Sequence, residues 1–126
     1  MRYLIIILNL FSLCISQFDW IDNGAPIRQG TYMQWQRVVD SGDAGELIFA
    51  WHDLRNGYSN IYIQKIDSLG NALWNEGGLT ITNSTKREED PLLVSDDNGG
   101  AFIVWIDYGE SIDCCGDKNP DGDIYI

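Results

Sequence analysis

Short apolar runs separated by turn-forming residues make up most of the chain. Residues 47–51 and 101–105 are runs of five apolar residues, each preceded by a glycine-containing turn, which is typical of fully buried strands. Residues 60–67 alternate between polar and apolar side chains. They predict a half-buried strand with Ile61 and Ile63, and in addition Ile66, on its inward face.

Two further strands and two tight turns follow the same pattern. Residues 72–74 predict a short strand, and residues 91–95 predict another that begins at a proline, where a strand tolerates the missing N–H. Residues 67–70 and 96–100 contain glycines that can take a positive φ, so both segments predict turns. No stretch after the first segment shows a helical period, and the fold class expected is therefore all-β and antiparallel.

The first segment predicts a secretory signal peptide in helical form over residues 1–16. Arg2 precedes an apolar run over residues 3–15, which is shorter than the about 20 residues that span a bilayer. Cys14 and Ser16 are small residues at the positions that a signal peptidase reads before a cut. We therefore expect a secreted or cell-surface protein. A buried N-terminal strand or helix and a lipid anchor at Cys14 are the alternatives.

The charge of the chain restricts its partners. With 8 Lys and Arg against 19 Asp and Glu, the formal net charge is −11. Such a surface repels the phosphate backbones of nucleic acids, and it repels anionic membranes once a leader has been removed. Cations are its natural small partners. The larger partner expected is an unidentified extracellular ligand, either a protein or a glycan.

An internal repeat of 54 residues runs through the chain. Without a gap, residues 20–53 lie over residues 74–107 with nine identities in 34 positions. The identical pairs are Trp20/Trp74, Gly24/Gly78, Ile27/Ile81, Thr31/Thr85, Ser41/Ser95, Asp43/Asp97, Gly45/Gly99, Trp51/Trp105 and Asp53/Asp107. Residues 60–63 then match residues 123–126 at an offset of 63, so the second copy carries nine additional residues in this connection.

The repeat predicts β-propeller-like blades of four antiparallel strands, about two of them and incomplete. Four strands per repeat suit such blades, and periods of about 40–50 residues are typical of propellers. Within a repeat region at 17–126, residues 17–33 form a closing strand segment, 34–87 the first repeat and 88–126 the second, incomplete repeat. A propeller needs at least about four blades, so we expect an N-terminal part of a longer protein. A complete small β-sandwich or a self-assembling pair of blades is the alternative.

Residues 49–78 carry a family resemblance. They resemble the repeats of large secreted bacterial β-propeller proteins, which read W-x-D-x-R, then I-Y-x-Q, then D-x-x-G and L-W. The positions that fit are Trp51, Asp53, Arg55, Ile61, Tyr62, Gln64, Asp67, Gly70, Leu73 and Trp74. The second copy keeps Trp105, Asp107, Ile124 and Tyr125 but has Gly109 in place of the arginine.

The resemblance implies a scaffold and no single activity. We therefore expect a secreted or cell-surface scaffold for binding or adhesion. The alternative is the N-terminal part of an exported glycan-acting hydrolase or lyase whose catalytic residues lie outside this chain.

The inserted loop of the second copy predicts a calcium site. Its spacing fits D-x-[DN]-x-[DN]-G, in which alternating oxygen ligands surround Ca²⁺ and the glycine, here Gly122, allows a sharp turn. The candidate ligands are Asp117, Asn119, Asp121 and Asp123. The acid at the twelfth place of such a loop would fall beyond the sequence. A solvated turn is the alternative, because Asn, Pro, Asp and Gly are also turn formers.

No catalytic residues are identified. His52 next to Asp53 invites a general-base reading, but the second copy has Ile106 at the histidine position. The shared tryptophan is therefore expected to pack between blades. The shared aspartate is expected to accept N–H groups of the following loop or to pair with Arg55. A histidine without a paired serine or cysteine does not support nucleophilic catalysis.

Three weaker signals do not indicate a functional site. Residues 88–90 (EED) predict a solvated charge run, and Tyr32, Trp35 and Tyr58 are expected to pack rather than to stack on sugars. The adjacent Cys114 and Cys115 could bridge to each other, bridge elsewhere or stay free.

Overall fold

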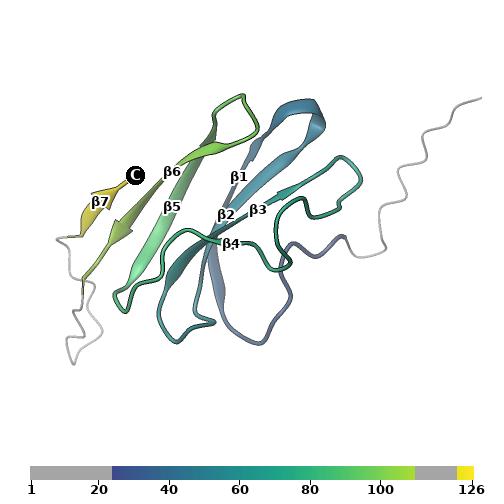
Figure 1. Cartoon of the computed structure of the whole chain (residues 1–126). Coiled ribbons are helices and arrows are strands. Elements are labelled where there is room, and N and C mark those ends of the chain that lie inside the picture. Colours follow the sequence, from purple (N-terminus) through teal and green to yellow (C-terminus); the bar gives the residue numbers. More distant parts are fainter. Residues whose placement is uncertain (1–23, 110–121) are drawn as a thin grey trace, which may run out of the picture.

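Two antiparallel β-sheets make up the part of the chain that the structure describes. A computed structural model describes residues 24–109 and 122–126 (Figure 1). The first sheet has the order β1-β2-β3-β4 and the second the order β5-β6-β7. The strands of the first sheet are β1 (Gln34–Ser41), β2 (Leu47–Asp53), β3 (Asn60–Ile66) and β4 (Leu79–Thr80). Those of the second sheet are β5 (Glu88–Ser95), β6 (Ala101–Asp107) and β7 (Asp123–Tyr125).

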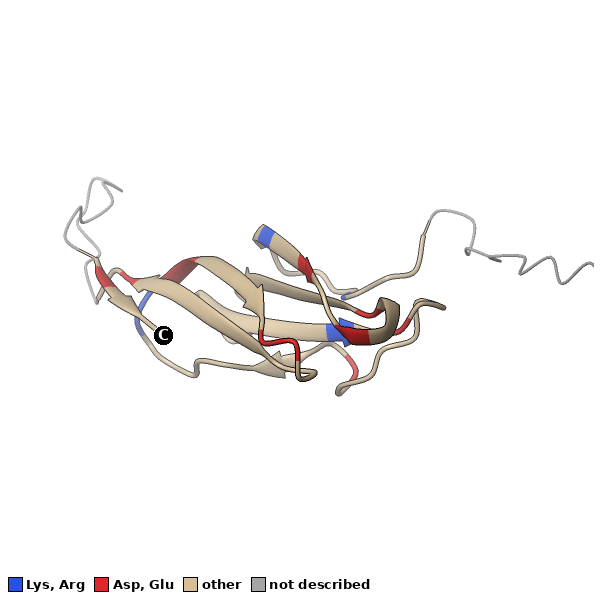
Figure 2. Cartoon of the chain, turned by 90° about the horizontal axis from the view of Figure 1, so that it is seen from above, with Lys and Arg blue, Asp and Glu red and all other residues tan. Residues whose placement is uncertain are grey.

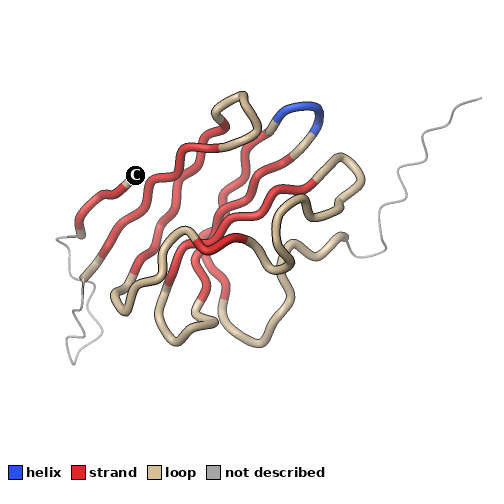
Figure 3. Tube along the Cα trace, in the orientation of Figure 1, coloured by secondary structure: helices blue, strands red, loops and turns tan. Residues whose placement is uncertain are grey.

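The all-β expectation is confirmed, and so are the strands expected at residues 47–51, 91–95 and 101–105. The single helical element among the described residues is a 3-10 turn, η1 (Asp43–Gly45), drawn in blue in Figure 3. Within the described ranges, no helix is long and apolar enough to cross a membrane. The expected signal peptide at 1–16 lies outside the described residues.

The two main hairpins have the same register, 54 residues apart. Gln34 pairs with Asp53 in the first sheet, as Glu88 pairs with Asp107 in the second. Each first strand carries a bulge at the same place, between Trp35 and Val38 and between Glu89 and Leu92. The left-handed residues within these bulges, Gln36 and Asp90, have φ values of 51° and 55°. Positions 54 apart are therefore equivalent in the two sheets.

The sheets pack face to face around one apolar core. Ala50, Ile61 and Ile63 of the first sheet are buried together with Ile103 of the second. Partly buried apolar side chains around this cluster are Val38, Trp74, Leu79, Leu93 and Trp105. β5 contacts β1, β2 and β3, and the layers are seen from above in Figure 2, with acidic residues at turns and strand ends. Burial of these aliphatic side chains is the main force that holds the layers together.

Unlike faces of the two sheets meet in this core. Successive side chains of a strand point to opposite faces. Ala50 of β2 therefore faces the second sheet and Trp51 faces away from it, toward the outer face of the first sheet. In β6 the order is reversed, because Trp105 packs against the core and Val104 points outward. Trp105 therefore packs between the two described sheets, as expected for the shared tryptophan, whereas Trp51 does not lie between them.

The strand expected at 60–67 is buried on both faces, so the half-buried expectation is wrong. All residues of β3 are buried. One face meets the second sheet, and the segment after β3 covers the other. Gln64 Nε2 donates to the carbonyl of Asn75, and the N–H of Ser84 donates to Asn60 Oδ1. The alternation of residues in β3 could not predict that its second face is covered, because a segment without regular secondary structure covers it.

The strand expected at 72–74 is also wrong. Ala72 makes a single bridge with Ile66, and the edge strand of the sheet is instead β4. The Gln64 side chain explains the difference, because its Oε1 accepts the backbone N–H of Trp74 and replaces a bond of the β ladder.

Residues 88–90 are not a solvated charge run. Glu88 begins β5 and is 7% exposed. Its N–H donates to the Ser59 carbonyl, and Ser59 Oγ donates to the Glu88 carbonyl. These two bonds tie the start of the second sheet to the β2–β3 loop.

The three aromatic residues expected to pack are only partly covered. Exposed fractions are 55% for Tyr32, 51% for Trp35 and 48% for Tyr58.

Candidate functional site

A buried carboxylate ends β2 and organises the corner that follows it. The side chain of Asp53 is fully buried. Its Oδ2 accepts a hydrogen bond from Arg55 Nη2 at 2.5 Å and lies 3.4 Å from Arg28 Nε, and its Oδ1 accepts the backbone N–H of Arg55 at 2.8 Å. Trp51 Nε1 also donates to Oδ2, at 3.3 Å. Both expected roles of this aspartate, loop acceptor and partner of Arg55, are confirmed.

These contacts keep Asp53 ionised. Burial alone would raise the pKa of its carboxyl. The guanidinium of Arg55, the Arg55 N–H and the Trp51 indole outweigh burial and hold the pKa below its usual value. A carboxylate with so many donors is a fixed structural anion and a poor proton acceptor.

His52 and Asp53 do not form a catalytic pair. As neighbours on a strand they point to opposite faces of the sheet. The buried His52 ring meets the Trp35 ring edge-on, with 5.9 Å between ring centroids and an interplanar angle of 73°. The structural interpretation of this dipeptide is therefore the correct one.

The Arg55 side chain is clamped on several sides. Its Nη1 donates to the carbonyl of Gly77 at 3.0 Å, and its guanidinium lies 3.8 Å from the centroid of the Tyr62 ring. Tyr62 in turn stacks on Trp51, with centroids 6.1 Å apart. This cluster joins the end of β2 to β3 and to the loop before β4.

The second sheet builds an equivalent corner with different partners. Asp107 Oδ1 accepts the N–H of Gly109 at 2.7 Å, and Lys86 Nζ donates to Asp107 Oδ2 at 3.0 Å. Trp105 stacks on Tyr125 with centroids 6.0 Å apart. The recurrence indicates that these corners terminate β2 and β6 and hold the first residues after each strand.

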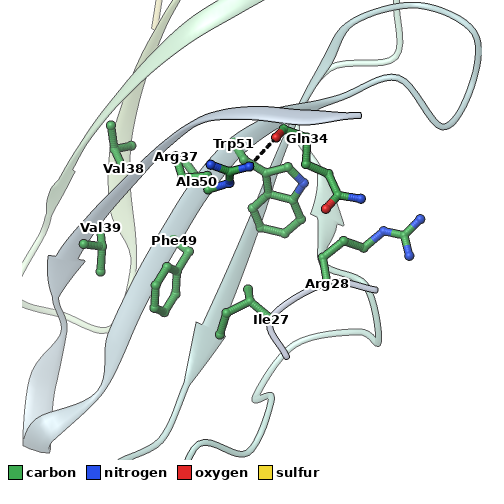
Figure 4. A pocket seen from close by; sticks show the side chains of 9 residues that line it. All are labelled: Ile27, Arg28, Gln34, Arg37, Val38, Val39, Phe49, Ala50 and Trp51. Carbon is green, nitrogen blue, oxygen red and sulfur yellow. Dashed lines mark hydrogen bonds between the residues drawn. The ribbon is translucent and has the colours of Figure 1, made fainter. Parts of the chain in front are cut away.

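A hollow opens on the outer face of the first sheet (Figure 4). Its volume is about 260 Å³. The lining residues are Ile27, Arg28, Gln34, Arg37, Val38, Val39, Phe49, Ala50 and Trp51. Three of them, Ile27, Phe49 and Trp51, provide a largely apolar surface, and Arg37 Nη2 donates to the Gln34 carbonyl at 2.6 Å. Such a hollow suits an apolar side chain or ring more than a charged group.

Sequence reasoning missed this hollow because three separate segments form it. Residues 27–28, 34–39 and 49–51 meet only when β1 pairs with β2 and the N-terminal segment crosses their outer face. The signal in the sequence was that Val39 and Phe49 alternate with residues that point to the core, which places both on the outer face of the sheet.

The predicted calcium ligands lie mostly outside the described residues. Asp117, Asn119 and Asp121 belong to the undescribed segment 110–121, as do Cys114 and Cys115. Asp123 is exposed at the start of β7, opposite Asp107. Within 24–109 and 122–126, no group of three or more His, Cys, Asp or Glu side chains could hold a metal ion.

No family model, no curated protein and no solved structure matches the chain. The proposed function therefore rests on the geometry described above.

Proposed function

We propose that this chain is part of a secreted or cell-surface β-propeller-type scaffold whose role is binding or adhesion. One observation carries the proposal, namely that the sheets meet through unlike faces. The inward row of the second sheet contains Trp105, whereas its equivalent in the first sheet, Trp51, lies on the outer face.

The way in which two equivalent sheets stack separates two kinds of architecture. When a two-fold axis relates two sheets, both sheets contribute the same face to the contact. Such a contact is closed, because no further sheet can join it in the same way. When one sheet follows the other by the same rotation, each presents one face forward and the opposite face backward, as blades around a propeller axis do. The described sheets stack in the second way, which supports blades and disfavours a closed sandwich.

The local chemistry agrees with a scaffold. The buried carboxylates of Asp53 and Asp107 are engaged at strand ends by Arg55 and Lys86. Their role is to hold loops. Loops on a rigid β framework are where binding groups are usually placed.

The nine-residue insertion of the second copy is such a loop, and we assign Ca²⁺ to it. The proposed ligands are Asp117, Asn119, Asp121 and Asp123, the last of which is the first residue of β7. The formal net charge of −11 makes a cation the natural counter-ion of this loop.

Export and calcium binding are tested on one preparation. The full chain with a C-terminal tag is expressed in an exporting bacterial host, and we expect it outside the cytoplasm with Gln17 as its first residue. Calorimetric titration with Ca²⁺ is expected to show binding that Asp121→Ala abolishes. The control Asp97→Ala removes an exposed acid from the β5–β6 turn and should leave binding unchanged. A cytoplasmic chain that retains Met1 contradicts export, and equal affinities of the two variants contradict the calcium site.

A further inference from the structure

The outer face of the second sheet is apolar and exposed. Leu92 is 66% exposed, Phe102 58% and Ile124 75%. Val94, 55% exposed, lies opposite Phe102, and Val104 lies opposite Leu92 on the same face. We call these five residues the outer face of the second sheet. A contiguous apolar face of this kind on a soluble domain marks a surface that another surface covers.

The same face of the first sheet shows what covers it. The equivalent pairs, 54 or 63 positions apart, are Val38 and Leu92, Ala50 and Val104, and Ile61 and Ile124. Val38, Ala50 and Ile61 belong to the core. Their cover is the inward row of an antiparallel sheet, formed by Leu93, Ile103 and Trp105. The outer face of the second sheet is therefore built for a row of the same chemistry.

This chain carries such a row a second time. Val39, Phe49 and Trp51 stand on the outer face of the first sheet at the positions equivalent to Leu93, Ile103 and Trp105. The hollow of Figure 4 lies over this row. Val39 is 55% exposed, whereas Trp51 is 3% exposed and forms the floor.

We infer that the outer face of the second sheet binds the outer face of the first sheet of a second copy of this chain. Leu92, Val104 and Ile124 of one copy lie over Val39 and Phe49 of the next, whereas Trp51, 3% exposed beside Ile27 and Arg28, stays outside the contact. Such a contact is heterologous, so copies stack head to tail and form a ring if the rotation closes, or a filament if it does not. This contact goes beyond the proposed scaffold function because its partner is a second copy of the chain. Its test measures self-association and nothing else.

Single charges on either face test the contact. Sedimentation velocity of the full chain is measured at rising concentration, and we expect self-association. Leu92→Glu and Val39→Glu each place an unpaired charge in the contact and are expected to weaken association about a hundredfold or more. Ile124→Glu is a second variant on the outer face of the second sheet. Leu69→Glu is the control, because Leu69 is 77% exposed and lies in the turn after β3, outside the strands of both sheets.

Mixing the two variants identifies the mode of stacking. Leu92→Glu keeps an intact first sheet and Val39→Glu keeps an intact second sheet, so an equimolar mixture should form a 1:1 complex that neither forms alone. Circular dichroism and thermal unfolding confirm that each variant is folded. A monomeric wild-type chain overturns the inference. Association that Val39→Glu leaves intact overturns it as well, because the second sheets would then pair with each other, and so does loss of association in Leu69→Glu.

Discussion

The corner at Asp53 provides the sharpest test of the described structure. Asp53→Asn keeps the shape of the side chain and an oxygen for the Arg55 N–H, but it removes the charge that Arg28 and Arg55 face. Removing one partner of a buried ion pair costs about 3–5 kcal/mol. The Arg55 side chain is 18% exposed, so water relieves part of this cost and about 3 kcal/mol is expected.

The equivalent substitution in the second sheet is the matched control. Asp107 pairs with Lys86, whose side chain is 44% exposed. Pairs with such exposure contribute about 0–1 kcal/mol, so Asp107→Asn is expected to cost about 1 kcal/mol including its loop contact. The same residue type at the same strand position is thus expected to differ about threefold in its effect.

Equilibrium unfolding of the full chain in urea measures both free energies. In a domain of this size each kcal/mol moves Tm by about 4–8 °C, so Tm should fall by more than about 10 °C for Asp53→Asn. Equal losses for the two variants, or a loss below about 1 kcal/mol for Asp53→Asn, would refute the assignment of the buried carboxylate as the anchor of this corner.

Two further predictions concern a close approach and a buried acid. Gly78 has a φ of +89°, and a Cβ there would lie 2.6 Å from Trp51 Cη2. Gly78→Ala should therefore cost about 2–4 kcal/mol, against about 1 kcal/mol for Gly57→Ala, which has a φ of +85° and no neighbour within 4 Å; equal costs in urea unfolding would contradict the packing. Burial raises the pKa of Glu88, so its protonated form favours the folded state and that contribution is lost as pH rises through the folded pKa. Glu88→Gln should consequently stabilise the chain at neutral pH, with a gain that shrinks as pH falls through the raised folded pKa, and a gain independent of pH would argue against a charged Glu88.

The local pattern of the sequence was sufficient for most strands. Residues 47–51 and 101–105 combine unbroken apolar character with a preceding turn, and β2 and β6 contain them. The relation between Asp53 and Arg55 was also readable, because a strand-end aspartate two residues before an arginine can reach both its N–H and its guanidinium. These features depend on neighbours along the chain, which a sequence displays directly.

Tertiary structure decided which face of each sheet is covered. Trp51 and Trp105 have matching sequence surroundings, yet only Trp105 lies between the sheets. The alternation of side chains shows which residues share a face of a strand. Segments distant in sequence determine what covers each face. The same reason explains β3, which reads as half-buried and is buried on both faces because residues after it fold back over its second face, and it explains the hollow at Phe49, which exists only where three separate segments meet.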